Sequence, residues 1–461
     1  MPLSIQAGKA GAPRRLAAAC VRSLEALQWA QGELNMCDTL YCASAGSFFG
    51  KNSDRQPDEP QSVCIVQRRT PSETATIGGR SYPASDAGLA FVLSKPSWMA
   101  GGEMGVNEKG VAIGNEAVFS RFKPARDGVL GMDILRAALG ASESAKAAVD
   151  FICAFVETYD QGGNGSLRGS LYYDNSFIIS DPHEAFILET AGRRWAWRSI
   201  EGRDAISNAY CIEEDYKRLD TQTRKEIAPV NERAACSDEA DPGRKGEKES
   251  FKAHMENRFY LNFTKGEERR ALSLSLLDGF QAGVDASEGS AVLKFFDILR
   301  SHGPYEPHSP WKNHMKSLCV HAGGIPASAS TASFVVDYRG ADSAILWFTG
   351  TSYPCVSLYK PMLLVKGEFM PLWADYEYAE GSARSEAYWR RWKKWLAASR
   401  AFLRGEDAAF AAGLDQAQES LVMIANKALS DIAALGDFAS LPVLRQEAGA
   451  VIAGWEKDIG L

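Results

Sequence analysis

The sequence lacks several features that would assign it at once to a broad functional class. It has no apolar run of about 18 residues, so no transmembrane helix is predicted. Its net charge is -7, with acidic and basic residues interspersed through most of the chain. Nucleic-acid binding usually needs a basic stripe. We therefore expect no membrane span and no nucleic-acid partner.

Metal-binding and disulfide patterns are also missing. The nine cysteines are an odd number and include no CxxC pair. Free thiols in a reducing compartment are the simplest interpretation, which predicts a cytoplasmic protein. Four of the six histidines fall in a short span, but their spacing is looser than in pairs such as HExxH. These four are His302, His308, His314 and His321. No metal site and no cofactor are predicted.

Composition divides the chain into three parts: an extension at 1–36, a mixed α and β body at 37–365, and a mainly helical region at 366–461. A charged stretch at about 221–250 is predicted to be an exposed loop or insertion. Three interpretations of the extension stay open. It could reflect a start codon assigned too far upstream, a removable propeptide or targeting segment, or a retained helix. The first two would expose the amine of Cys37, and the third would block it.

Short apolar runs between turn residues predict a β-rich first part of the body. Strands are expected at 39–44, 47–51, 62–67, 89–94, 110–115, 176–180, 185–189, 195–199, 205–208, 332–337, 343–348 and 355–359. Helical spacing covers 131–139, 142–159 and 255–300, the last with a break at 279–289. After residue 381 an alanine-rich tail predicts one or two helices, packed on the body or forming a dimer surface, so a homo-oligomer is left open. This order suits two stacked, mostly antiparallel sheets between helical layers.

The chemistry is expected at Cys37, which directly follows Met36. If Met36 is removed, Cys37 carries a thiol with a pKa of about 8.5 and an α-amine with a pKa of about 7.7–8.0. Near neutral pH that amine can take the thiol proton, which is a known way to activate a nucleophile. The alternative is a cysteine that acts only as a small buried hydrophobe.

Several polar residues could assist this thiol. Asp54 could hold the amine, or it could simply close a turn. Asn115 and Asn208 are each the last residue of an expected strand, and their amides could donate to the oxyanion of a tetrahedral intermediate. The alternative is an asparagine that only shapes the turn at the strand end. The candidate substrate-binding residues are Lys51, Arg55, Trp98, Glu103, Glu116 and His321. A carboxylate would suit a substrate amine, and an aromatic wall would suit an apolar side chain, although each residue could instead be structural.

A series of short motifs resembles the secernin and dipeptidase family of N-terminal-nucleophile (Ntn) cysteine hydrolases. The resemblance covers about residues 36–365, and the motifs occur in the family's order. They are Cys37–Thr39, Gly50–Arg55, Pro96–Trp98, Gly102–Gly105, Asn107–Ala117, Gln161–Asn164, Asn175–Phe177, Leu188–Gly192, Ile206–Asn208, Cys319–Gly324 and Phe348–Ser352. Bile-salt hydrolases and penicillin V acylases share this plan more distantly.

The resemblance implies an α+β fold, specifically the four-layer αββα Ntn-hydrolase sandwich, with a helical C-terminal tail added. It also implies a nucleophilic role for Cys37, and it matches Asp54, Asn115 and Asn208 to residues that line acylase sites. Lys51 stands where acylases carry an arginine, so a bidentate clamp would be lost there unless Arg55 supplies it.

The resulting hypothesis is a dipeptidase that hydrolyses small peptides through Cys37, without a metal or organic cofactor. Two alternatives stay open. One is an acylase that uses the same nucleophile on a non-peptide amide. The other is a non-catalytic, secernin-like interaction or trafficking protein.

Overall fold

A computed structural model describes most of the chain beyond the extension. The described residues are 36–43, 47–83, 86–227, 249–283, 290–303, 315–322, 328–399, 407–436 and 438–461. The predictions for the extension and for most of the charged stretch therefore concern residues outside the described part of the chain. The division into three parts stays a prediction.

One sheet contains the predicted nucleophile on its second strand. Its seven strands are antiparallel throughout. Their order is β12 (Arg203–Ile206), β1 (Met36–Cys42), β2 (Ser47–Arg55), β14 (Ala329–Gly340), β15 (Ser343–Phe348), β16 (Lys360–Val365) and β17 (Glu368–Pro371). The strands predicted at 39–44, 47–51, 205–208, 332–337 and 343–348 are thus confirmed, with ends that differ by a few residues at most.

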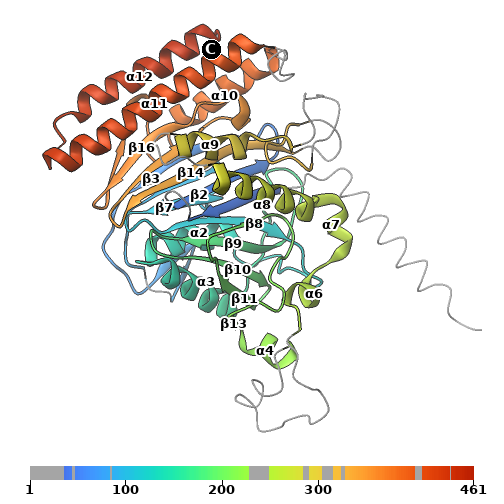
Figure 1. The fold of residues 1–461 in the computed structure, drawn as a ribbon. Coiled ribbons are helices and arrows are strands. Elements are labelled where there is room, and N and C mark those ends of the chain that lie inside the picture. Colours follow the sequence, from blue (N-terminus) through green and yellow to red (C-terminus); the bar gives the residue numbers. More distant parts are fainter. Residues whose placement is uncertain are drawn as a thin grey trace, which may run out of the picture.

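A second, eight-stranded antiparallel sheet lies against the first (Figure 1). Its order is β13 (Arg218–Leu219), β11 (Arg194–Ser199), β10 (Ala185–Ala191), β9 (Asp174–Ser180), β8 (Ala112–Val118), β7 (Met104–Asn107), β6 (Phe91–Pro96) and β3 (Gln61–Val66). A separate hairpin pairs β4 (Ala75–Ile77) with β5 (Arg80–Tyr82). The strand β7 and this hairpin were not predicted, because both are very short.

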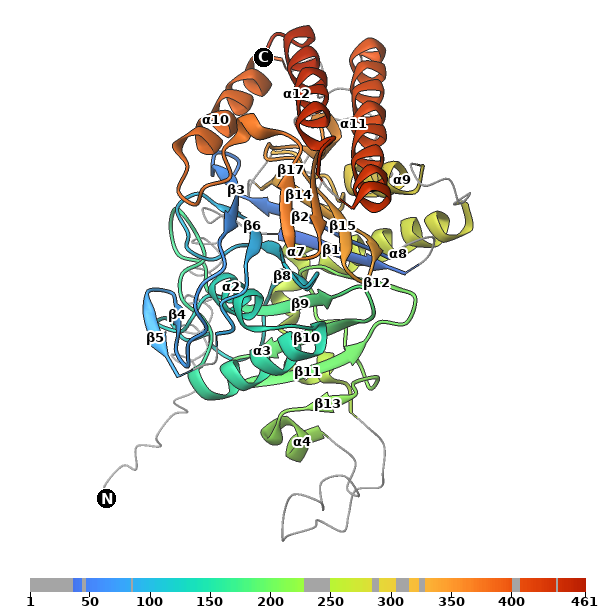
Figure 2. The same ribbon diagram turned by 90° about the vertical axis from the view of Figure 1, so that its left-hand side faces the viewer.

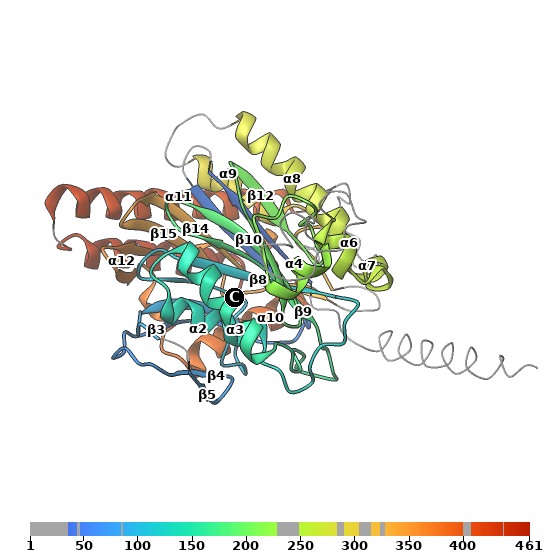
Figure 3. The same cartoon turned by 90° about the horizontal axis from the view of Figure 1, so that it is seen from below.

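Helices cover the outer face of each sheet. On the second sheet, α2 (Gly131–Ala141) contacts β7 and β8, and α3 (Ala145–Tyr159) contacts β9 to β11; Figure 3 looks onto this layer from below. On the first sheet, α8 (Gly266–Gly283) contacts β1 and β12, and α9 (Ser290–Arg300) contacts β2 and β14. The predicted α+β, four-layer αββα sandwich is confirmed (Figure 2).

Glycines set the spacing between these layers. A Cβ on Gly114 of β8 would come within 2.9 Å of the Lys51 side chain and 2.9 Å of Phe49, both on β2. On the other face of β2, a Cβ on Gly50 would meet the Phe295 ring of α9 at 2.5 Å. The second sheet and α9 therefore approach β2 closely from both sides, which buries the strand next to the nucleophile.

Two predicted elements are wrong in detail. The helical region expected at 255–300, with its break at 279–289, contains four helices in its described residues: α6 (Phe251–Met255), α7 (Arg258–Thr264), α8 and α9. The chain turns at Lys265, which has a left-handed φ of 53°. The strand expected at 355–359 is instead the 3₁₀ turn η3 (Pro354–Val356), because Tyr353 has a left-handed φ of 61° and a proline follows. A further short helix, α4 (Thr221–Ile227), begins the charged stretch.

The tail contains three helices in the described residues rather than the one or two predicted. They are α10 (Ala383–Ala398), α11 (Ala408–Leu435) and α12 (Leu441–Asp458), with the 3₁₀ turn η4 (Ala374–Tyr376) before them. The helix α11 ends at Gly436, which has a left-handed φ of 70°. Trp389 and Trp392 are buried, and their indole nitrogens donate to the Thr331 and Ser352 carbonyls. The tail therefore packs on the body.

Candidate active site

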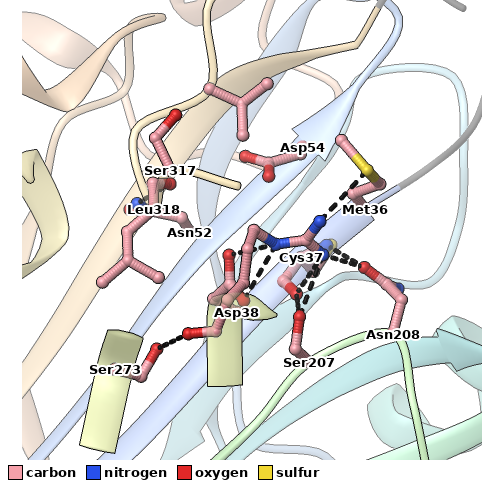
Figure 4. Close-up of polar contacts among 12 residues, drawn as sticks. Met36, Cys37, Asp38, Asn52, Asp54, Ser207, Asn208, Ser273, Ser317 and Leu318 are labelled. Atoms are coloured by element: carbon pink, nitrogen blue, oxygen red, sulfur yellow. Dashed lines mark hydrogen bonds and ion pairs between the residues drawn. The ribbon is translucent and has the colours of Figure 1, made fainter. Parts of the chain in front are cut away.

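Successive side chains of β1 point to opposite faces of the strand, so Cys37 and Asp38 lie in different chemical environments. The Cys37 sulfur faces the second sheet and lies 3.4 Å from Glu103 Oε2. The next side chain, Asp38, faces the opposite way and forms a 3.0 Å ion pair with Arg269 of α8. Figure 4 shows this divergence along the strand. Successive strand residues point to opposite faces, so β1 presents a thiol on one side and an anchoring carboxylate on the other.

The backbone nitrogen of Cys37 is held by a side chain from another strand end. Asn208, which follows β12, accepts this N–H at 2.9 Å through its Oδ1 (Figure 4). Its Nδ2 donates to the Ala117 carbonyl of β8 at 2.7 Å. The sequence predicted that the Asn208 amide would donate to an oxyanion. In this structure its oxygen accepts from the Cys37 backbone and its Nδ2 is bound to Ala117, so the oxyanion role stays a prediction.

Arg269 is the main site residue that the sequence analysis missed. Its buried guanidinium donates to Asp38, to Asn208 Oδ1 and to Ser207 Oγ at 2.9 Å. It also donates to the Thr264 and Met315 carbonyls. Arginine can satisfy this many acceptors because it carries five donors in a planar fork. It therefore fixes both the strand that bears Cys37 and the asparagine that holds the Cys37 nitrogen.

The start of α8 explains how Arg269 reaches the site. A Cβ on Gly266 would lie 2.6 Å from the Asn208 carbonyl carbon. Only glycine allows the first residue of α8 to pack so closely on this segment. Arg269 follows within one turn and points back at β1. A glycine at the start of a charged helix was the one sequence signal that could have revealed this contact.

Asp54 lies on β2 directly opposite Met36 in the register of the pair. Its Oδ1 accepts the Ser330 hydroxyl at 2.5 Å, whereas its Oδ2 is buried and makes no hydrogen bond within the described residues. Burial, together with the nearby charge of Asp38, raises the pKa of Asp54 well above its ordinary value. The predicted contact between Asp54 and an α-amine of Cys37 stays a prediction.

Three of the predicted substrate-binding residues belong to one network, which reaches the thiol through Glu103. Arg55 pairs with Glu103 at 2.5 Å and with Glu59 at 2.8 Å, all buried. Trp98 donates its indole N–H to Glu59 Oε1 at 2.6 Å and is 43% exposed. Arg55 binds both Glu103 and Glu59, and Glu59, which the sequence analysis did not single out, links Arg55 to Trp98. Of these residues, Glu103 contacts the Cys37 sulfur.

Lys51 and Glu116 form a second buried pair, which joins the two sheets at 3.1 Å. Glu116 also accepts from Thr39, and Lys51 donates to the Asn115 carbonyl at 2.7 Å. Burial raises the pKa of Glu116 to about 8, against the opposing effect of Lys51. Although burial by itself lowers the pKa of Lys51, the charges of Cys37, Glu116 and Glu103 raise it above its ordinary value. Lys51 therefore keeps a positive charge next to the thiol.

The environment of the Cys37 thiol disfavours its ionised form. Burial raises the pKa of Cys37 well above its ordinary value; Lys51 opposes this effect, and Glu103, Glu116 and Asp54 add to it. The nucleophile of such enzymes is the thiolate. With Met36 attached, the nitrogen of Cys37 is a peptide nitrogen with no basic lone pair.

Asn115 is engaged elsewhere in this structure. Its Nδ2 donates to Asn175 Oδ1 at 3.0 Å. To serve as the predicted oxyanion donor, the Asn115 amide would have to exchange this bond for one to the substrate. That role stays a prediction.

His321 belongs to a different group of side chains. Its Nε2 lies 3.4 Å from Cys319 Sγ and 3.2 Å from Cys355 Sγ. Its ring stacks on Tyr353 with 4.2 Å between centroids. The predicted substrate-binding role of His321 is untested, and the cluster around it was not foreseen.

Met36 fills an apolar pocket next to the site. It is 0% exposed and packs with a cluster of Met99, Ala117, Phe119, Met132, Leu171, Tyr173, Met315 and Val320. Its sulfur lies 3.2 Å from a guanidinium nitrogen of Arg269. Removal of Met36 would leave an apolar space that begins at the Cys37 nitrogen.

Comparisons with known proteins give a weak similarity of fold. No family model matches the sequence. A mutant of conjugated bile acid hydrolase from Clostridium perfringens is 12% identical, with 68% of this chain and 88% of that chain covered and a TM-score of 0.40. Penicillin V acylase from Agrobacterium tumefaciens is 11% identical, with 71% and 84% covered and a TM-score of 0.40. These similarities carry no argument about the chemistry of this chain.

Among the described helices, none is long and apolar enough to cross a lipid bilayer.

Proposed function

We propose that this protein is an amide hydrolase whose nucleophile is the Cys37 thiol, activated by the α-amine that appears when Met36 is removed. The observation that carries the proposal is the arrangement of three features around Cys37 and its neighbour Met36. The Cys37 sulfur faces a buried charged pair, its nitrogen is held by Asn208, and the Asp54 oxygen that lacks a partner among the described residues belongs to the residue opposite Met36.

In the proposed reaction the α-amine takes the thiol proton, and the thiolate attacks the carbonyl carbon of the amide. The resulting oxyanion collapses to a thioester on Cys37, and the α-ammonium gives its proton to the leaving amine. The α-amine of Cys37 then takes a proton from a water molecule, and the resulting hydroxide attacks the thioester. The carboxylic acid product leaves, and the α-ammonium returns its proton to the Cys37 sulfur. Lys51 favours the thiolate through its charge, while Asn208 and Asp54 would hold the nitrogen in place.

The apolar pocket now filled by Met36 supports a substrate with an apolar acyl group or side chain. Arg269 borders this pocket, and Glu103 lies beside the sulfur. A small peptide fits this combination, because it offers an apolar side chain for the pocket and an amine for the Glu103 carboxylate. We therefore propose the dipeptidase activity that the secernin-like motifs imply, with an acylase acting on a non-peptide amide as the alternative.

The test is a comparison of chains that begin at Cys37 with chains that retain Met36 or the whole extension. Each is assayed on a panel of dipeptides and N-acyl amines with apolar acyl groups. We expect hydrolysis only when Cys37 is the first residue, and the preferred substrates distinguish the dipeptidase from the acylase. Intact-mass measurement establishes the first residue in each sample.

The variant Cys37→Ala should abolish hydrolysis. Its matched control is Cys42→Ala on the same strand, where the side chain points to the opposite face from that of Cys37. Full activity in Cys37→Ala, or in a chain shown to retain residues upstream of Cys37, would contradict the proposal. In that case the non-catalytic interaction protein would be favoured only if no chain hydrolyses any amide in the panel.

A further inference from the structure

A second cluster of reactive side chains lies where three segments of the body meet. His302 follows α9, Cys319 and His321 belong to the segment 315–322, and Cys355 is in η3. Each residue offers one nitrogen or sulfur atom, and these four atoms all lie within 4.8 Å of one another. Three of the residues are buried and Cys355 is partly buried. The residues come from separate stretches of the sequence, so only the fold brings them together.

The spacing of these atoms suits a tetrahedral ion. Zinc binds sulfur at about 2.3 Å and nitrogen at about 2.0–2.1 Å, so neighbouring ligand atoms lie about 3.3–3.8 Å apart. His321 Nε2 lies 3.4 Å from Cys319 Sγ and 3.2 Å from Cys355 Sγ. Small side-chain movements would therefore convert the cluster into a coordination shell.

The imidazole of His321 is already oriented for this role. Its ring stacks on Tyr353, whose hydroxyl oxygen accepts the Ala322 N–H at 3.3 Å. The His302 ring lies edge-on to the His321 ring, with 5.1 Å between centroids. Metal-binding histidines are commonly held by such surrounding contacts. The left-handed backbone of Tyr353, at φ 61°, places this support just before Cys355 in the chain.

Both thiols lie away from solvent, Cys319 fully and Cys355 partly. A metal binds the thiolate form of cysteine. A buried thiolate is costly unless a positive charge lies next to it, and a divalent cation would supply that charge.

We propose that His302, Cys319, His321 and Cys355 form a structural site for a divalent zinc-class metal ion. Two sulfurs and two imidazole nitrogens favour zinc over magnesium or calcium, which prefer oxygen ligands. Four protein ligands leave no open position for substrate, which is typical of structural rather than catalytic zinc. This inference is independent of the proposed hydrolase activity, and it replaces the expectation of no metal drawn from histidine spacing alone.

The metal would tie together segments that support the nucleophile. Val320, between the two ligands Cys319 and His321, exchanges hydrogen bonds of 2.9 Å with Ser330. The Ser330 hydroxyl donates to Asp54. Asn52 on β2 donates to the carbonyls of Leu299 and Leu318, which precede His302 and Cys319; Figure 4 shows Asn52 beside Leu318. The proposed ion would thus hold in place the Ser330 hydroxyl that donates to the Asp54 carboxylate.

The test is metal analysis of the full chain, expressed without a histidine tag, loaded with zinc and passed through gel filtration. We expect about one zinc per chain, and less than about a tenth in Cys319→Ser, Cys355→Ser and His321→Asn. The matched control is Cys64→Ser, which alters a buried cysteine outside the cluster and should keep the full zinc content. Cobalt loading should give a sulfur-to-cobalt charge-transfer band that is absent in Cys355→Ser.

A second measurement uses the unaltered chain, so it tests the proposal even if the variants do not fold. With zinc bound, Cys319 and Cys355 should resist alkylation, and a chelator should expose both together. The proposal is overturned if the zinc-loaded chain holds less than about a tenth of an ion and shows no cobalt band. It is also overturned if peptide mapping of chain isolated under reducing conditions finds a Cys319–Cys355 disulfide.

Discussion

Asn208 Oδ1 accepts a hydrogen bond from the Cys37 nitrogen at 2.9 Å, across 171 residues of sequence. The same oxygen accepts from Arg269, and the other end of the amide is anchored on β8. The asparagine that holds the nitrogen of the proposed nucleophile is therefore itself fixed at both ends. This arrangement would set the orientation of an α-amine before a substrate arrives.

Loss of the Asn208 amide should impair catalysis more than binding. In Asn208→Ala the α-amine of a chain starting at Cys37 loses its acceptor, so we expect kcat to fall by about 10²-fold, with a smaller change in KM. The measurement is steady-state kinetics on the best substrate of the panel. The control is Asn52→Ala, which removes a buried asparagine that donates to the Leu299 and Leu318 carbonyls. An equal fall in kcat for both variants would mean that Asn208 acts only through stability.

Replacement of Arg269 should destabilise the fold strongly. Arg269→Met leaves the buried Asp38 carboxylate without its partner, which should cost about 3–5 kcal/mol of unfolding free energy. Arg270→Met is the matched control, because its neighbouring, partly exposed pair with Asp204 should contribute about 1 kcal/mol or less. Urea unfolding of both variants measures the difference. Similar losses for the two would show that Arg269 is not the anchor of β1.

A methyl group between the sheets should also be costly. Gly114→Ala places a Cβ 2.9 Å from Lys51 and Phe49, and Lys51 cannot yield freely while it pairs with Glu116. We expect a loss of about 1–3 kcal/mol from overpacking. Gly449→Ala in α12, where no atom of the described residues lies within 4 Å of the new Cβ, should be neutral or stabilising by about 0.5–1 kcal/mol. Thermal unfolding of the two variants checks the contrast in sign.

Lys360 should make stability depend on pH in the alkaline range. It is 1% exposed, and burial lowers its pKa from 10.5 to about 7. Between these values the unfolded chain binds the proton that the folded chain has released. The contribution of Lys360 to stability therefore rises with pH from about 7 to 10.5, by up to about 1.4 kcal/mol per pH unit.

The measurement is urea unfolding of the original chain and of Lys360→Met at several pH values in that window. As pH rises, the unfolding free energy of the original chain should increase relative to that of Lys360→Met. A difference that stays constant would mean that the Lys360 ammonium remains protonated, held by the Thr349 and Leu358 carbonyls to which it donates.

Local signals in the sequence predict most strands, while the four-layer arrangement follows only from the resemblance of the motifs to a known family, and the role of Cys37 stays a prediction. Apolar runs ending at turn residues locate most strands, and the order Met36-Cys37 itself identifies the thiol. The sequence could not predict Arg269. That residue lies in a run of charges typical of a solvated helix face, and only the packing of Gly266 on Asn208 turns it inward.

The same limit applies to the histidine and cysteine cluster. The pair Cys319 and His321 is close in sequence, but His302 and Cys355 come from the end of a helix and from a turn that was predicted to be a strand. Glu59 was missed for a related reason. Its importance lies in the contacts to Arg55 and Trp98, which sequence spacing does not specify.

The burial of Met36 has a consequence for the timing of maturation. Its peptide bond to Cys37 lies inside a paired strand, and its side chain is covered on all sides. A separate peptidase could not reach that bond in the folded protein. If Cys37 becomes the first residue, the cut must come during synthesis, before β1 pairs with β2, or the folded chain must make it on itself.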